Sequence, residues 1–364
     1  MFPADDDSQL TPAVAELLAA RAGDDAMALV QIARLVAPND GAMARRFARR
    51  AVALAPRDEK VRTLAAETLS RGVAGWHFRI VGDARRNQAY DAAIRQAVTP
   101  DTRVLDIGAG SGLLAMMAAR AGAAAVASCE MNATIAEAAA EIVAANGYAA
   151  QVTVLARHSG EVDTADISGR ADLLVSETIS NDVVAQGWLP ALEDAKARLL
   201  TPDARIIPAR TIARVALGFD SRLSQERMGD VDGFNLSGFN ALAPARYQIR
   251  AESDRMALRS APADLFDFDF QNDTRFPEGK ASAELVADGG EINGIVQWVA
   301  IGLDQDNWYE NAPGARSCWA PLFYPLGRAI RPAAGTRIAV HGSHDRRRMI
   351  VWAELPAPAE AEIS

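Results

Sequence analysis

The sequence has few of the residues that build disulfide frameworks or metal sites. Only two cysteines, Cys129 and Cys318, and four histidines occur in 364 residues. The cysteines stand far apart, and no cysteine or histidine has the spacing of a zinc ligand set such as CxxC or HExxH, so we expect no bound metal. Scarce cysteine is typical of a reducing compartment, and we expect a cytoplasmic protein.

Long apolar runs and basic stripes are missing as well. Uncharged runs such as 107–119 are shorter than the ~18 residues that span a bilayer, and the acidic start MFPADDDSQL lacks the apolar core of a signal peptide, so we expect no membrane association. The formal net charge is −9, without a basic stripe to neutralise phosphates, so we expect no nucleic-acid partner. The length predicts about two or three globular domains.

The first part of the chain predicts helices. After an acidic lead over residues 1–10, which we expect to be disordered, residues 11–72 are rich in Ala, Leu and Arg with helical periodicity. Two stretches, 35–40 (LVAPND) and 54–58 (LAPRD), each combine a helix end, a proline and a residue that can start a new helix. The pattern resembles one or two tetratricopeptide repeats. Residues 1–72 are therefore expected to be either a partner-binding arm or a helical cap on the next domain.

The stretch 104–130 carries the clearest motif of the chain. An apolar strand meets the glycine turn 108–112 (GAGSG), a helix rich in Ala and Met follows, and a second apolar strand ends at Glu130. Glycines let the backbone turn tightly beside a ligand, the helix start offers unpaired N–H groups, and an acid after the second strand can bind ribose hydroxyls. We therefore predict a nucleotide-binding βαβ unit.

Strands and helices continue to alternate after this unit, which predicts a parallel, doubly wound sheet. We expect a helix at 134–146, strands at 152–155 and 172–176, and a helix near 189–200. Ligands of such sheets bind outside the carboxyl ends of the strands. The features that should converge there are Asp106, Glu130, the turn 157–161 and Glu177.

Beyond about residue 205 apolar and polar residues alternate with a period of two. Such stretches are 205–217, 266–270, 295–303, 337–341 and 349–355. They predict an all-β second domain over 206–356, either a sandwich or a barrel. Residues 218–260 are rich in charge, Gly, Asn and Ser, which indicates an inserted loop or an arm of short helices, and 357–364 form a polar tail.

The form of the glycine turn indicates which nucleotide is bound. In DIGAGSG the acid Asp106 stands just before the first glycine, and an acid suits a cationic amino-acid ligand but repels a pyrophosphate. The motif resembles motif I of class I S-adenosylmethionine (SAM) methyltransferases more than the NAD fingerprint. Upstream, the aromatic stretch 76–90 (WHFRIVGDARRNQAY) leads into a helix that can close on a bound cofactor, with Arg86 free to pair with a carboxylate.

The residues after the strand 173–176, ETISNDVVAQGW (177–188), together with the preceding motifs resemble the protein arginine methyltransferases. The resemblance extends from Trp76 to Leu355 and implies a Rossmann-like class I methyltransferase domain (73–205) followed by a β-barrel for substrate binding and dimerisation (206–356). It places Arg86 at the methionyl carboxylate and Glu130 at the ribose. The full set that it assigns to SAM binding is Arg86, Asp106, Gly108, Gly110, Gly112, Glu130, Ser159, Gly160 and Glu161.

The family holds the substrate guanidinium with two glutamates of one hairpin. Glu177 matches the first, but Gln186 stands at the second position, and Asp182 of the same hairpin can substitute for the missing charge. A glutamine still accepts a hydrogen bond, but losing the charge costs about 1–2 kcal/mol. The family's barrel loop Thr-His-Trp is represented by Ser317-Cys318-Trp319, where the thiol of Cys318 cannot take over the histidine's handling of a proton. The resemblance thus assigns Glu177, Gln186 and Asp182 to catalysis and Cys318 and Trp319 to the substrate site.

The leading hypothesis is a SAM-dependent methyltransferase that acts on a guanidino nitrogen of arginine in a protein or peptide. A second hypothesis is a methyltransferase of a small molecule or a non-arginine nitrogen, because both departures lie where the substrate is handled. A third is a catalytically weak SAM-binding scaffold whose helical arm binds partners. Family members dimerise through an arm inserted in the barrel, which maps to 218–260 here, so a homodimer is expected although no clear apolar helix stands there.

Overall fold

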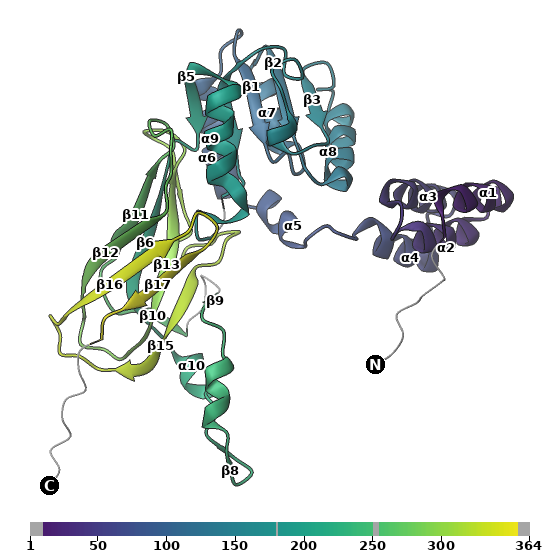
Figure 1. Ribbon diagram of the computed structural model, residues 1–364. Coiled ribbons are helices and arrows are strands. Elements are labelled where there is room, and N and C mark those ends of the chain that lie inside the picture. The colour runs from purple at the N-terminus through teal and green to yellow at the C-terminus, as the bar shows by residue number, and fades with distance from the viewer. Residues whose placement is uncertain (1–9, 180, 250–254, 356–364) are drawn as a thin grey trace, which may run out of the picture. The chain divides into compact units, whose positions relative to one another are not determined.

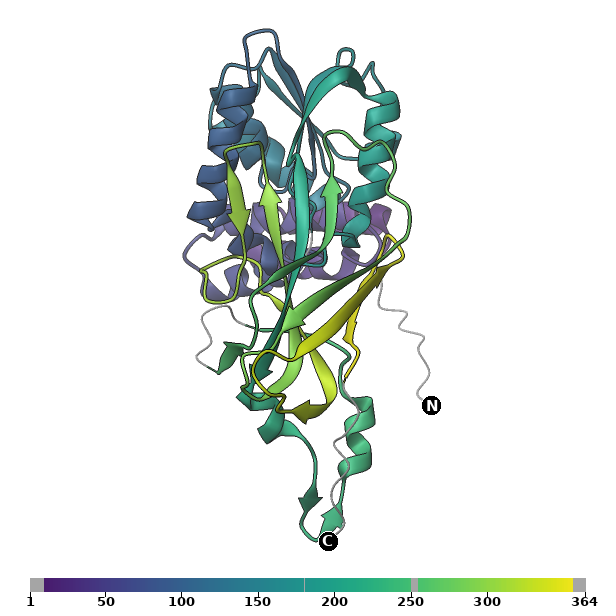
Figure 2. The same cartoon turned by 90° about the vertical axis from the view of Figure 1, so that its left-hand side faces the viewer.

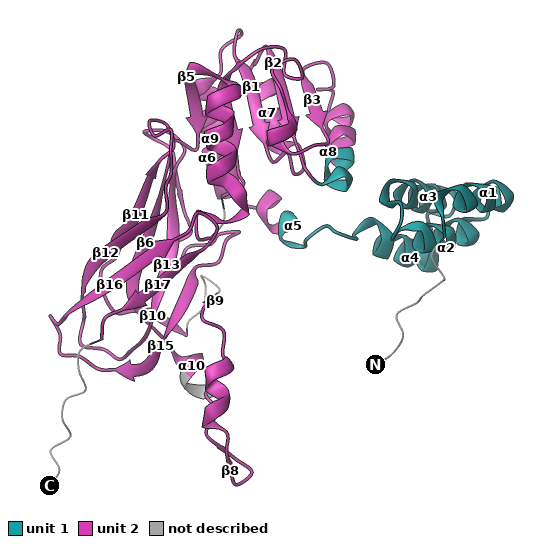
Figure 3. Cartoon of the chain, viewed as in Figure 1, with its two compact units in different colours: residues 1–78, 132–138 teal, residues 79–131, 139–364 magenta. Residues whose placement is uncertain are grey.

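The structure is a computed structural model that describes residues 10–179, 181–249 and 255–355, with the backbone alone for 224–226. The expected acidic lead, apart from residue 10, and the polar tail lie outside the described residues. Contacts divide the chain into two units, residues 1–78 with 132–138 and residues 79–131 with 139–364 (Figure 3).

Unit 1 is helical, as the alanine-rich composition predicts. Three of its helices start at aspartates, Asp25, Asp40 and Asp58, whose side chains accept a hydrogen bond from a backbone N–H of the first turn. Two of these caps follow the prolines of the predicted helix restarts, so both restarts are present. Whether the helices are tetratricopeptide repeats stays a prediction. The helices are α1 (Pro12–Ala22), α2 (Ala26–Val36), α3 (Gly41–Leu54) and α4 (Glu59–Leu69).

Unit 2 contains the predicted parallel sheet, whose strands run in the order β3-β2-β1-β4-β5. The sequence order reverses between β1 and β4, which is where ligands of doubly wound sheets bind. The strands are β1 (Arg103–Ile107), β2 (Ala125–Cys129), β3 (Val152–Leu155), β4 (Ala171–Ser176) and β5 (Leu200–Ile207). The helices around them (Figure 1) are α6 (Ala84–Ala97), α7 (Leu113–Arg120), α8 (Ala133–Ala145) and α9 (Trp188–Arg198), and α5 (Trp76–Val81) precedes α6 in the chain.

Two antiparallel sheets follow and curl into a barrel-like domain (Figures 1 and 2). Their apolar faces continue the core of the parallel sheet, and the central strand β13 (Ile292–Gly302) is buried along its whole length. The Rossmann-like and β-barrel prediction is therefore confirmed. The remaining strands of these sheets are β6 (Arg210–Asp220), β9 (Tyr247–Gln248), β10 (Met256–Leu258), β11 (Ala263–Asp269), β12 (Gly279–Val286), β14 (Trp308–Glu310), β15 (Leu322–Ile330), β16 (Arg337–His344) and β17 (Met349–Ala353).

The alternating stretch 205–217 is not a single strand of the second domain. Its first residues end β5 in the parallel sheet and its last residues begin β6 in the barrel. Pro208 lies between them, and because proline has no backbone N–H it cannot continue a ladder of hydrogen bonds.

An arm extends from the end of the barrel (Figures 1 and 2). It consists of α10 (Ser221–Glu226), the short hairpin of β7 (Asp230–Val231) and β8 (Phe234–Asn235), and the 3₁₀ helix η3 (Ser237–Leu242). In the described part of the chain, no helix combines the length and apolarity needed to cross a membrane.

Candidate functional site

The glycine turn joins β1 to α7 in a backbone conformation that favours glycine. Gly108, Gly110 and Gly112 have φ values of +88°, +52° and +77°, and a Cβ on Gly108 would lie 2.5 Å from Cγ2 of Thr178. The N–H of Gly110 donates a hydrogen bond to Oε2 of Glu130 at 3.2 Å. The acid at the end of β2 therefore lies against the turn, as the βαβ motif predicts.

Asp106 is buried at the end of β1. Its Oδ2 accepts a hydrogen bond from Oγ of Ser128 at 2.6 Å, whereas Oδ1 is buried without a partner among the described residues. Burial raises the pKa of Asp106 to about 6, against the opposing effects of Ser128 and Arg86. An unsatisfied buried oxygen is costly unless a ligand donates to it, so Asp106 suits a ligand with an ammonium group.

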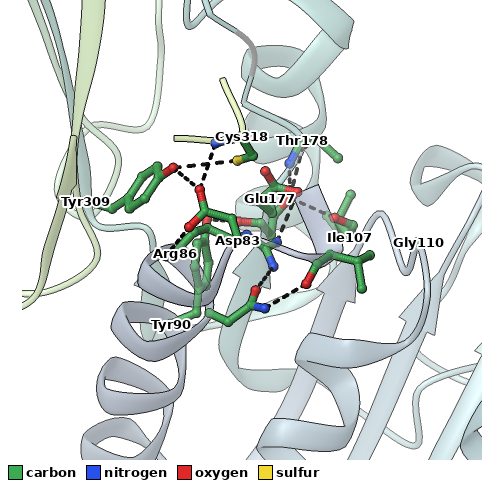
Figure 4. A network of polar contacts seen from close by, with 12 residues as sticks. Asp83, Arg86, Tyr90, Ile107, Gly110, Glu177, Thr178, Tyr309 and Cys318 are labelled. Carbon is green, nitrogen blue, oxygen red and sulfur yellow. Dashed lines mark hydrogen bonds and ion pairs between the residues drawn. The ribbon is translucent and has the colours of Figure 1, made fainter. Parts of the chain in front are cut away.

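A buried ion pair joins α6 to the end of β4 (Figure 4). Nη2 of Arg86 lies 3.0 Å from Oε2 of Glu177, and the guanidinium lies over the ring of Tyr90 at 4.9 Å. The hydroxyl of Tyr90 donates to the carbonyl oxygen of Ser176 at 2.9 Å and so holds the strand end. Nε of Arg86 and Oε1 of Glu177 are both buried without a hydrogen-bond partner among the described residues. Each member of the pair therefore has one polar atom left for a ligand.

Burial also changes the acidity of Glu177. It raises the pKa of this carboxyl to about 7, while the charge and hydrogen bond of Arg86 act in the opposite direction. A carboxyl with this pKa can bind a cation when ionised and can take up a proton near neutral pH.

The barrel contributes a second group of polar side chains (Figure 4). Oδ2 of Asp83, the residue that caps α6, accepts hydrogen bonds from the hydroxyl of Tyr309 at 2.5 Å and from the backbone N–H of Cys318 at 2.8 Å. The Tyr309 hydroxyl also lies 2.6 Å from Oγ of Ser317. Burial raises the pKa of the Cys318 thiol to about 12, so the thiol stays neutral. Trp319 is buried and packs edge-on against Tyr309.

The turn that was predicted to contribute to SAM binding forms a short 3₁₀ helix, η1 (Ser159–Glu161), after β3. Nδ1 of His158 accepts a hydrogen bond from the N–H of Gly160 at 3.0 Å, which fixes the turn. Ser159 is buried, whereas Gly160 and Glu161 are exposed. The structure thus places the turn at the predicted edge of the sheet.

The other two hairpin residues are not arranged as a second substrate carboxylate. Asp182 is buried and forms an ion pair with Arg246 at 2.9 Å, close to the root of the arm. Gln186 is exposed and has a φ of 62°. Of the three predicted hairpin residues, Glu177 alone is buried against Arg86. The compensation expected from Asp182 competes with its pairing to Arg246.

Two residues of this site were missed by sequence reasoning, Asp83 and Tyr309. Asp83 had a local signal, because an aspartate directly before a predicted helix is a common N-cap. Tyr309 had none, because its bond to Asp83 spans 226 residues of sequence.

Comparisons with known proteins identify the family of the chain. The family model described as ribosomal protein L11 methyltransferase (PrmA) matches residues 89–208. An arginine N(omega)-methyltransferase of Streptomyces achromogenes subsp. streptozoticus is 32% identical over 280 residues, which cover 76% of this chain and 77% of that protein. The chain belongs to the protein arginine methyltransferase family.

Other members of the family extend the comparison. Protein arginine N-methyltransferase 1.6 of Arabidopsis thaliana is 28% identical over 306 residues, and the match spans 74% of this chain but 42% of that protein. The Trypanosoma brucei PRMT1 enzyme–prozyme heterotetrameric complex with AdoHcy superposes with a TM-score of 0.67 at 21% identity, over 78% of this chain and 98% of that chain. Arabidopsis protein arginine methyltransferase 10 does so with a TM-score of 0.63 at 16% identity, over 76% and 95%. At these identities the two structures show the fold.

Family membership confirms the predicted enzyme class, a SAM-dependent methyltransferase, and with it the cofactor. The residues present fit SAM, because Nε of Arg86 and Oδ1 of Asp106 have no partner among the described residues. The first can donate to a carboxylate and the second can accept from an ammonium group. The roles of the individual residues stay predictions.

Proposed function

We propose that the protein transfers a methyl group from SAM to a guanidino nitrogen of arginine beside Glu177. The observation that carries the proposal is the buried Oε1 of Glu177, which has no hydrogen-bond partner in the part of the chain that the structure describes. Glu177 follows β4 directly and pairs with Arg86. An isolated buried carboxylate oxygen is unfavourable, and a cationic guanidinium is the acceptor substrate that would satisfy it best.

In this proposal SAM is held by Arg86, Asp106, Glu130 and the glycine turn, with the turn 159–161 near the adenine. SAM supplies an electrophilic methyl group. Arg86 also acts on Glu177. Its positive charge opposes the rise in the pKa of this buried carboxyl and so favours the ionised form.

Glu177 would act on the substrate in two ways. A guanidinium is always protonated at neutral pH, so an ionised carboxylate binds it, draws its charge to one side and orients the nitrogen that is methylated. The new N–C bond would replace the bond between the methyl group and the sulfur of SAM, which would leave as a neutral thioether. The methylated nitrogen would then lose one proton, which Oε1 of Glu177 can accept and release to water. Gln186 is uncharged and exposed, so it adds no second charge to this step.

The acceptor can be free arginine or an arginine in a protein. The Streptomyces relative is named for arginine and the Arabidopsis relative for protein arginine. The family pattern has two glutamates in this hairpin, whereas this chain has the uncharged Gln186 at the second position. Because of this difference, a methyltransferase that acts on a small molecule is the second candidate function.

The test supplies methyl-labelled SAM with free L-arginine in one reaction and an arginine-rich peptide in another. After acid hydrolysis, labelled methylarginine in either reaction supports the proposal, and the reaction that gives it identifies the acceptor. Label transfer to neither, with SAM bound normally in calorimetry, overturns it.

We also propose that the chain forms a homodimer through its arm. Phe234, Phe239 and Leu242 are 70%, 64% and 74% exposed, which is unusual for side chains of this size. The double substitution Phe234→Asp and Phe239→Asp is expected to convert a dimer into a monomer in light scattering, and an unchanged mass would contradict the proposal. A cytoplasmic location and a partner for residues 1–72 stay predictions.

A further inference from the structure

We propose that Tyr309 is a positioning residue of the methyl-transfer site, whose hydroxyl locks the barrel loop Ser317–Trp319 against the start of α6 through Asp83. As far as it concerns methyl transfer, the inference rests on the proposed function.

Asp83 is the point at which three segments meet. Its Oδ1 caps α6 by accepting the N–H of Arg86 at 3.0 Å, and its Oδ2 accepts the Tyr309 hydroxyl at 2.5 Å and the N–H of Cys318 at 2.8 Å. One carboxylate therefore connects the helix that carries Arg86 with β14 and with the loop that follows it. Figure 4 shows these side chains pointing toward one another beside Glu177.

Packing and hydrogen bonds hold the hydroxyl of Tyr309 in one position. The residue is 2% exposed, its ring packs edge-on against Trp319 at 5.6 Å, and its hydroxyl also lies 2.6 Å from Oγ of Ser317. That Oγ in turn accepts the N–H of Trp319 at 3.1 Å. A fixed ring loses little entropy when its hydroxyl forms a hydrogen bond, so the bond contributes more to positioning than a flexible side chain could.

The protonation states suit this role. Burial raises the pKa of Tyr309, so the hydroxyl keeps its proton and donates it in a hydrogen bond. Burial alone would raise the pKa of Asp83, but the hydrogen bonds from Tyr309 and from the backbone of Arg86 and Cys318 hold it below the ordinary value. The hydrogen bond from the Tyr309 hydroxyl to the ionised carboxylate of Asp83 is therefore charge-assisted.

The same network explains how the loop can function with cysteine where the family has histidine. The neutral thiol of Cys318 is a weak donor that lies 3.6 Å from the Tyr309 hydroxyl. Tyr309, rather than the thiol of Cys318, supplies the strong side-chain donor to Asp83. Its role is to position Asp83 and the loop, because its hydroxyl is engaged by Asp83 and Ser317.

The test compares Tyr309→Phe with a matched control, Tyr247→Phe. Tyr247 also donates its hydroxyl to a carboxylate, Oδ2 of Asp220 at 3.1 Å, but at the base of the arm. In the protein without SAM, we expect amide hydrogen exchange in residues 316–319 to become at least about tenfold faster in Tyr309→Phe and to stay unchanged in Tyr247→Phe. With SAM and acceptor, kcat should fall about 10- to 100-fold in Tyr309→Phe alone, while the Kd for SAM changes less than about threefold.

A rescue variant separates positioning from packing. Adding Cys318→His to Tyr309→Phe restores a strong donor to the loop, and we expect slow exchange and at least about a third of the wild-type kcat to return. Unchanged exchange in Tyr309→Phe, a kcat within twofold of wild type, or no recovery in the double variant would overturn the inference. If the wild-type protein methylates no arginine, the proposed function fails, whereas the exchange data still decide whether Tyr309 locks the loop.

Discussion

The ion pair between Asp182 and Arg246 predicts that the hairpin carrying Glu177 depends on the root of the arm. Oδ1 of Asp182 accepts the N–H of Ala185 at 3.2 Å, and Oδ2 lies 2.9 Å from Nη1 of Arg246. Val183 beside it has a φ of 67°, a conformation that a β-branched residue rarely adopts. A strained hairpin needs support from its surroundings, and the ion pair supplies part of that support.

The size of the effect follows from burial. Removing one partner of a fully buried ion pair costs about 3–5 kcal/mol of unfolding free energy, because the other charge is left uncompensated. The side chain of Asp182 is 3% exposed, but that of Arg246 is 26% exposed, so water compensates part of the loss. We expect about 1–3 kcal/mol for either Asp182→Asn or Arg246→Gln, and a coupling energy of about 1–2 kcal/mol between them.

The assay is a double-mutant cycle in urea unfolding, with methyl transfer measured on the same four proteins. Both single variants should lose activity to a similar extent, and the double variant should lose little more, because each breaks the same contact. A coupling energy below about 0.5 kcal/mol would refute the reasoning. So would an inactive Asp182→Asn beside a fully active Arg246→Gln, which would place Asp182 in the substrate site, as the sequence predicted.

The substitution Gly108→Ala would bring a methyl group to 2.5 Å from Cγ2 of Thr178 at a φ of +88°, so SAM should bind at least about tenfold more weakly in calorimetry, and an unchanged affinity would contradict this. Because the pKa of Glu177 is about 7, its ionised form is lost as the pH falls, and kcat/KM should drop about tenfold per pH unit below 7; a profile flat from pH 8 to 6 would show that another group binds the substrate. Burial lowers the pKa of His344, so below pH 6.5 the unfolded chain binds a proton at this residue more readily than the folded chain does. The free energy of unfolding is therefore highest above the unfolded pKa of about 6.5 and decreases as the pH falls below it. The urea midpoint should therefore decrease from pH 7.5 to 5.5 in wild type and decrease less in His344→Gln; equal slopes would exclude His344 as the cause.

The glycine turn and the acid that lies against it could be predicted because their signal is local. A strand, a glycine turn, a helix and a terminal acid follow one another within residues 104–130, so the positions of Gly108 and Glu130 depend on near neighbours in sequence. The alternation of helices and strands likewise predicts a parallel, doubly wound sheet, because short connections leave few topologies open.

The substrate half depends on contacts that no local pattern reports. Asp182 lies in a hairpin that matched the family, but its partner Arg246 comes from the inserted arm, so the pairing could not be foreseen. His344 lies at the end of β16, yet it is only 6% exposed. Here a signal was present, because His344 is in phase with the buried Ile338 and Val340 of β16, and a period of two places all three side chains on the same face.

The most direct test of the account is methylarginine formation by Glu177→Gln beside a matched surface variant, Glu284→Gln on the exposed face of β12. Both substitutions remove one carboxylate, but only the first removes the group that faces Arg86. We predict that Glu177→Gln loses at least about 100-fold in kcat/KM while Glu284→Gln stays within twofold of wild type, because a charged hydrogen-bonding group is lost where charge shifts during the reaction. Equal activity of the two variants would contradict the claim that arginine is methylated beside Glu177.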